Sequence, residues 1–134
     1  MIESCVFTDE ISHDFEEAVR SCAELHVRYI EPRAVWDTDI NKIDLDGAER
    51  MKSILDKYGV RVGIIGSGFG KCSLTDEKEW AEHLEILERQ FRFCDLFGTR
   101  LIRGFPFWLP AGDDWDRSPR PVMADYIERI GDRM

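Results

Sequence analysis

Charged, polar and aromatic side chains cluster at four places in the sequence, each directly after a short apolar run. The first three groups are Thr8, Asp9 and Glu10; Glu31, Arg33 and Trp36; and Ser67, Phe69 and Lys71, and the fourth is Arg103, Phe105, Phe107 and Trp108. Convergent polar groups beside aromatic rings suit a small polar ligand with apolar faces, such as a sugar. Any one of these charges could equally form a structural ion pair, so the prediction rests on the whole group.

The glycine-rich stretch at residues 63–72 invites comparison with phosphate-binding loops, but it lacks their spacing. A Walker A motif ending at Gly70-Lys71 would need glycine at Ile65 and serine or threonine at Cys72. A dinucleotide fingerprint starting at Gly66 would need a third glycine where Lys71 stands. The glycines are therefore expected to let a loop turn sharply, and Lys71 is left free to meet an anion such as a sugar phosphate.

Residues for metal binding or nucleophilic catalysis are sparse. His13, His26 and His83 have no HxH or HxxxH spacing, and the sequence contains no GxSxG motif. We expect His83 to be solvated or to flank a helix rather than to bind a metal. The sequence thus predicts no metal site and offers no catalytic residues that can be named.

Four apolar runs that alternate with amphipathic segments must position these side chains. Strands are predicted at 4–8, 28–31, 60–65 and 100–105, with helices from Asp14, over 46–58, over 76–97 and over 122–130. Gly59 and Gly98 are the expected ends of the second and third helices. This alternation is typical of an α/β fold with parallel strands, either as an open sheet or as a barrel with all helices outside. In both cases the polar groups would meet at the carboxyl ends of the strands.

The overall charge narrows the choice of partners. Eighteen Lys and Arg against 27 Asp and Glu give a net charge of −9, which disfavours nucleic-acid and anionic-membrane partners. No apolar run approaches the ~20 residues of a membrane helix, and no secretory signal is visible at the N-terminus. We therefore expect a cytoplasmic protein whose four widely spaced cysteines are reduced.

The order of several motifs resembles the sugar phosphate isomerase/epimerase family, a group of xylose-isomerase-like TIM barrels. The motifs lie at residues 6–12 (VFTDEIS), 30–33 (IEPR), 67–74 (SGFGKCSL), 82–87 (EHLEIL) and 98–108 (GTRLIRGFPFW). Together they extend the resemblance over roughly residues 3–130. The common Glu-Leu-Arg of the second strand reads Glu31-Pro32-Arg33 in this chain.

The resemblance implies a (β/α)₈ barrel that isomerises or epimerises sugars with a divalent metal, Mn, Mg or Zn. The metal would polarise the substrate while carboxylates move the proton. The substrate-binding residues it implies in this chain are Phe7, Glu31, Lys71, Arg103 and Trp108. The family's metal ligands belong to strands five to eight, and the catalytic residues are likewise expected beyond the fourth strand.

Length predicts that residues 1–134 form a single domain, the N-terminal half of such a barrel, apparently truncated. A TIM barrel typically takes about 250 residues, and this chain has four βα units. We expect a four-stranded parallel sheet in the order 1-2-3-4 with all helices on its outer face, and as partner either a second copy or the missing C-terminal half. The isolated chain is expected to be inactive.

Two alternatives stay open. One is a non-catalytic half-barrel that dimerises or binds a sugar without converting it. The other is a protein like the apurinic-site endonucleases, which the charge of −9 and the lack of histidines near the second and third strands disfavour. The sequence leaves open which sugar is bound, whether it is phosphorylated, whether it is isomerised or epimerised, and which metal is used.

Overall fold

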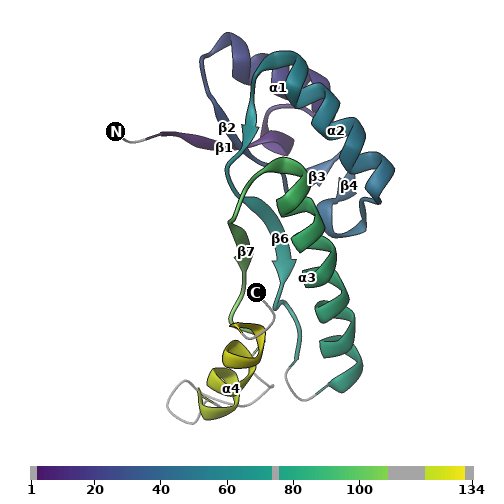
Figure 1. Cartoon of the computed structure of the whole chain (residues 1–134), viewed down its shortest axis with the longest axis vertical. Helices are drawn as coiled ribbons and strands as arrows, with labels where there is room; N and C mark the ends of the chain where they lie inside the picture. The colour runs from purple at the N-terminus through teal and green to yellow at the C-terminus, as the bar shows by residue number, and fades with distance from the viewer. Residues whose placement is uncertain (1–2, 74–75, 109–119, 132–134) are drawn as a thin grey trace.

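A computed structural model describes residues 3–73, 76–108 and 120–131, and it shows strands alternating with helices (Figure 1). The strands are β1 (Cys5–Phe7), β2 (Tyr29–Glu31), β3 (Ala34–Val35), β4 (Thr38–Asp39), β5 (Arg61–Val62), β6 (Ile65–Phe69) and β7 (Ile102–Gly104). The α-helices are α1 (Phe15–Glu24), α2 (Leu45–Tyr58), α3 (Glu77–Phe97) and α4 (Arg120–Gly131), and two short 3-10 helices are η1 (Thr8–Glu10) and η2 (Ile40–Lys42). The α/β class predicted from the sequence is confirmed.

Short polar side chains and glycines fix the ends of the helices. Asp14, Asp44 and Asp76 each accept hydrogen bonds from backbone N–H groups in the first turn of α1, α2 and α3. Gly59 and Gly98 end α2 and α3 in the left-handed conformation, both with φ 69°, as predicted. Helix α2 begins at Leu45, just before the predicted start at Asp46, because the capping side chain is that of Asp44.

The parallel strands form two sheets, β1-β2-β5 and β6-β7, and not the single four-stranded sheet that we predicted. The predicted strand 60–65 is broken because the chain changes its hydrogen-bonding partner there. The N–H of Gly63 donates to Ile30 O within β2, whereas the N–H of Ile65 donates to Leu101 O just before β7, both at 2.9 Å. The predicted sequential order of neighbours is kept, with the third strand divided between the two sheets.

Strand β6 occupies much of the segment predicted as a glycine-rich loop. Ile65 pairs with Ile102 and Phe69 with Gly104, so between these two pairs β6 advances by four residues and β7 by two. Such a bulge suits glycine, which can carry backbone past its neighbours where a side chain would collide. Ser67 and Phe69, predicted to follow the third strand, therefore lie within it and are buried.

A small antiparallel hairpin, β3-β4, follows β2 and was not predicted. Its turn residues Trp36 and Asp37 have φ 50° and 58°, a conformation that usually selects asparagine or glycine. The Trp36 ring compensates by packing edge-on against Phe15, with centroids 5.9 Å apart, and by lying 4.3 Å from the guanidinium of Arg50.

The hydrophobic core lies between the strands and helices α1 to α3. Ile30, Val62 and Ile65 of the strands are buried in one cluster with residues of those helices, and α1 packs on α2 and α2 on α3. These three helices therefore cover one face, as the barrel prediction requires. No described helix is both long enough and apolar enough to cross a membrane. Residues 109–119, and the side chains of Val122, Met123 and Tyr126 in the helix predicted over 122–130, lie outside the described residues and side chains.

Candidate functional site

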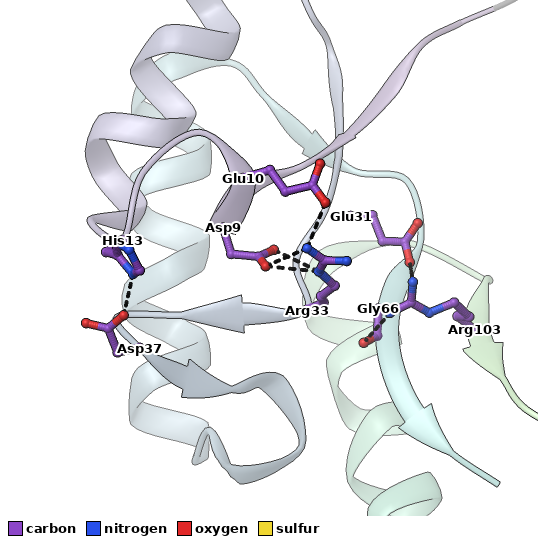
Figure 2. Close-up of polar contacts among 8 residues, drawn as sticks. All are labelled: Asp9, Glu10, His13, Glu31, Arg33, Asp37, Gly66 and Arg103. Atoms are coloured by element: carbon purple, nitrogen blue, oxygen red, sulfur yellow. Dashed lines mark hydrogen bonds and ion pairs between the residues drawn. The ribbon is translucent and has the colours of Figure 1, made fainter. Parts of the chain in front are cut away.

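The inner face of the strands carries Phe7, Glu31 and Arg103, three of the five predicted binding residues. Figure 2 shows the contact between Glu31 and Arg103. Ile30 is buried beneath the helices, so its neighbour Glu31 projects from the opposite face of β2. Phe7 is the register partner of Glu31 on β1. All three residues lie at or near the carboxyl ends of their strands, where parallel α/β folds hold their sites.

Glu31 and Arg103 form an ion pair across the inner face. The Nη1 of Arg103 lies 3.0 Å from Oε1 of Glu31, and the two side chains are 29% and 12% exposed. The carboxylate oxygen has no aligned hydrogen bond, so charge attraction holds the contact. The Nη2 of Arg103 donates to Gly66 O at 3.2 Å. A Cβ at Gly66 would lie 2.8 Å from both Pro32 O and Arg33 Cβ, so only glycine fits against the segment that follows β2.

Arg33 is held by two carboxylates from η1, as Figure 2 shows. Its Nη2 lies 2.9 Å from both Asp9 Oδ2 and Glu10 Oε1, and its Nε donates to Asp9 Oδ2 at 2.9 Å. The hydrogen bond to Asp9 raises the pKa of Arg33 above its usual value. The guanidinium also lies 4.3 Å from the centroid of the Phe7 ring.

Lys71 joins this group through Phe105, a residue of the predicted polar rim. The Nζ of Lys71 lies 4.3 Å from the centroid of the Phe105 ring, and Arg103 lies 5.6 Å from the same ring and 5.4 Å from that of Phe7. Each such contact contributes about 0.5–1 kcal/mol at an exposed site. Two aromatic rings thus alternate with three cations, Arg33, Arg103 and Lys71. The three carboxylates pair with only two of these cations, Asp9 and Glu10 with Arg33 and Glu31 with Arg103, so Lys71 has no ion pair among the described residues.

Trp108, the fifth predicted residue, stands further along the chain from β7. Its N–H donates to Cys72 O at 2.9 Å, its backbone bridges to Ser73, and it is 57% exposed. We call Phe7, Phe105, Arg33, Arg103 and Lys71 the ring-and-cation group. Trp108 lies beyond this group, as an exposed aromatic side chain next to the segment that follows β6.

His83 has a structural role that the sequence did not indicate. Its Nδ1 accepts a hydrogen bond from the N–H of Gly70 at 3.1 Å, which holds the end of β6 against α3. Burial lowers the pKa of His83, and the nearby Glu79 and Glu82 oppose that effect. The neutral ring that accepts this bond is therefore favoured.

Among the described residues, no group of three or more His, Cys, Asp and Glu side chains could hold a metal ion. The carboxylates nearest the strand ends are committed to arginines: Asp9 and Glu10 to Arg33, and Glu31 to Arg103. The described part of the chain does not fit the divalent metal that the resemblance implies.

Comparisons with known proteins show the fold. No protein-family model matches the sequence, and a search of curated proteins finds no significant match. Among solved structures, a D-psicose 3-epimerase determined in the presence of D-fructose aligns with TM-score 0.70 and 16% identity over 98% of this chain and 48% of that one.

Two further structures give the same result. A fusion protein of a xylose isomerase-like TIM barrel and 4-hydroxyphenylpyruvate dioxygenase aligns with TM-score 0.67 and 15% identity, over 96% of this chain and 19% of that one. A xylose isomerase domain protein from Alicyclobacillus acidocaldarius subsp. acidocaldarius aligns with TM-score 0.60 and 18% identity, over 87% and 40%. The chain thus spans less than half the length of each of these proteins, and over that span it has the fold of a xylose isomerase-like TIM barrel, in the form of a half-barrel of parallel βα units.

Proposed function

We propose that this chain provides the substrate-binding half of a sugar isomerase or epimerase barrel. The observation that carries the proposal is the Glu31–Arg103 pair, which spans the inner face at the carboxyl ends of β2 and β7. Oε1 of the largely buried Glu31 has no aligned hydrogen bond, and burying such an acceptor lowers the stability of the fold. A sugar hydroxyl that donates to this oxygen would satisfy it. The D-psicose 3-epimerase and xylose isomerase-like neighbours support the same reading.

Each residue of the site has a different role in binding, set by its chemistry. Glu31 accepts hydrogen bonds from hydroxyl groups, and Arg103, which it holds in place, donates to a hydroxyl or carbonyl oxygen. The rings of Phe7 and Phe105 provide apolar surface for the C–H face of a sugar. These groups bind and orient a substrate.

Proton transfer and metal binding belong, in this proposal, to βα units other than the four described. A divalent metal would polarise the substrate's carbonyl and hydroxyl oxygens. Because Asp9, Glu10 and Glu31 are paired with arginines, the ligands of that metal would come from those other units.

A second half-barrel completes the site in this proposal. Strands β1 and β7 each have one neighbour in the described sheets, and their free edges are open to further strands. The partner is either a second copy of this chain or four further βα units. Either would cover the inner face and seclude Glu31 and Arg103 from water.

Sugar binding tests the proposal directly. The 134-residue chain is titrated with D-fructose and D-psicose by calorimetry, together with Glu31→Gln and Arg103→Met. Loss of a charged hydrogen bond costs about 1.5–3 kcal/mol, so each variant should bind roughly ten-fold or more weakly.

Arg28→Met is the control, because Arg28 makes an ion pair of similar length with Glu3, at 2.9 Å, that is more exposed and lies before β2, away from its carboxyl end. It should bind as the unchanged chain does. The proposal is wrong if no sugar binds, or if Glu31→Gln and Arg103→Met bind as tightly as the control.

A further inference from the structure

Asn41, in η2, is fixed at its backbone and at one side of its amide. Its N–H donates to Asp39 Oδ1 at 2.8 Å, and its backbone carbonyl accepts from Nη1 of Arg89. Its side-chain Oδ1 accepts from Ser67 Oγ at 3.0 Å and from Gln90 Nε2 at 3.3 Å. Both of these partners are fully buried, so the position of the Asn41 side chain is set by the core.

In the structure, the amide of Asn41 is placed with its oxygen toward Ser67 and Gln90. Ser67 and Gln90 donate to its oxygen, so its Nδ2 lies on the other side. Within the described residues, Nδ2 is the one polar group of Asn41 for which no hydrogen-bond partner is found. This amide nitrogen, on a half-buried side chain, is therefore available to donate a hydrogen bond to a bound ligand.

Gly68 leaves the space in front of that nitrogen open. A Cβ at Gly68 would lie 3.1 Å from Asn41 Nδ2 and 3.9 Å from Cδ of Lys71. The absence of a side chain on β6 therefore creates a gap bordered by the amide on one side and the lysine stem on the other. The Lys71 ammonium lies over the Phe105 ring, so the gap borders the ring-and-cation group.

We propose that Asn41 Nδ2 and the Lys71 ammonium form a donor-only subsite over Gly68 that binds a neutral oxygen, a hydroxyl or carbonyl, of the sugar. This rests on the proposed function and adds a residue to it. Both flanking groups donate and neither accepts, so the subsite selects an acceptor oxygen. Carboxylates neutralise Arg33 and Arg103, so Lys71 is the one cation of this group without an ion pair among the described residues. A single ammonium is a weak match for a phosphate dianion, which is better held by several charge-assisted donors, so a neutral oxygen is favoured.

The test follows the side-chain amide of Asn41 by ¹H–¹⁵N NMR on the full 134-residue chain, with the signal assigned by its loss in Asn41→Asp. D-Fructose, D-fructose 6-phosphate and inorganic phosphate are titrated in parallel. We expect D-fructose to shift the Asn41 side-chain signal together with backbone amides near Glu31 and Arg103.

Gly68→Ala fills the gap and should abolish the Asn41 shift and weaken D-fructose binding roughly ten-fold. Gly104→Ala is the matched control, because its Cβ would lie at an ordinary 3.5 Å from Phe69 Cδ1, and it should behave as the unchanged chain. Both variants are compared only where their backbone spectra show the fold intact, and Asn41→Asp supplies a second weakened variant if Gly68→Ala does not fold.

The outcomes separate this subsite from the proposed function. If backbone amides near Glu31 shift while the Asn41 signal does not, the subsite is wrong and the proposed function stands. If no sugar shifts any signal, both are wrong. If phosphate or the sugar phosphate shifts Asn41 and D-fructose does not, the assignment to a neutral oxygen is wrong.

Discussion

Gly70 and Phe105 meet at the carboxyl ends of β6 and β7 so closely that a Cβ on Gly70 would lie 2.0 Å from the Phe105 carbonyl oxygen. The N–H of Phe105 donates to Phe69 O at 2.8 Å, which fastens the two chain segments together at this point. Gly70 also has φ 83°, so the position excludes other residues by backbone conformation and by space.

Gly70→Ala is therefore expected to destabilise the chain much more than an ordinary glycine substitution. Gly59→Ala is the matched control, with a similar φ of 69° and nothing within 4 Å of its Cβ. We expect a loss of about 1 kcal/mol at Gly59, from conformation alone, and of more than about 3 kcal/mol at Gly70. Urea unfolding measures both, and equal losses would show that the contact with Phe105 relaxes at little cost.

The Glu31–Arg103 pair should show a measurable coupling energy. Removing one partner leaves the other charge with little water around it, so Glu31→Gln and Arg103→Met alone should each cost about 1–3 kcal/mol of stability. The double variant should cost about 1–2 kcal/mol less than the sum. Urea unfolding of the four proteins measures the coupling, and strict additivity would mean that the two charges do not stabilise one another.

Acid should destabilise the fold through His83. Burial lowers the pKa of His83 in the folded state below its value in the unfolded chain. The unfolded chain therefore takes up more protons as the pH falls below about 6.5, and the free energy of unfolding falls with it.

His83→Gln removes this titration. Urea midpoints at pH 7.5 and pH 5.5 should therefore differ more for the unchanged chain than for the variant. The same pH dependence in both proteins would assign the acid sensitivity to other groups.

Association should depend on the inner side of the strands. We expect the chain at micromolar concentration to form a dimer of about 31 kDa, twice its 15.6 kDa, by light scattering after size exclusion. Leu101, 58% exposed beside the open edge strand β7, should contribute to the contact, so Leu101→Lys should shift the population to monomer.

Leu25→Lys is the control for that substitution, because Leu25 is 74% exposed at the end of α1, among the helices. It should leave the dimer intact. A cooperatively unfolding monomer that binds no hydrophobic dye would contradict this prediction.

The sequence predicted the features that depend on local chemistry. The order of strands and helices followed from apolar spacing, and Gly59 and Gly98 ended their helices where expected because a left-handed cap favours glycine. Glu31 and Arg103 were both predicted as binding residues, and the parallel order of the strands brought them to the same inner face.

The remaining features depend on contacts that spacing does not record. The break at Gly63 arises because neighbouring backbone groups bond to β2 and β7, a choice made by tertiary packing. The turn at Trp36 and Asp37 exists because Phe15 and Arg50 hold the ring of Trp36. The sequence offered no reason to select Asn41 as a binding residue, since an asparagine between two elements usually marks a turn. Its hydrogen-bond partners Ser67 and Gln90 are also distant in sequence. A glycine within a strand often marks a place where another group approaches the backbone closely. Gly66 could therefore have indicated where Arg103 contacts the backbone of β6 beside Glu31.

The sequential order of the strands also bears on how quickly the chain reaches its native state. Cys5 pairs with Tyr29, Tyr29 with Arg61, and Ile65 with Ile102, so the longest of these loops closes over 37 residues, 102 minus 65. Loop closure of this size adds little entropy cost from one unit to the next. Each βα unit can therefore dock on the one before it as it emerges from the ribosome, and the ion pair between Glu31 and Arg103 forms only after β7 has been made.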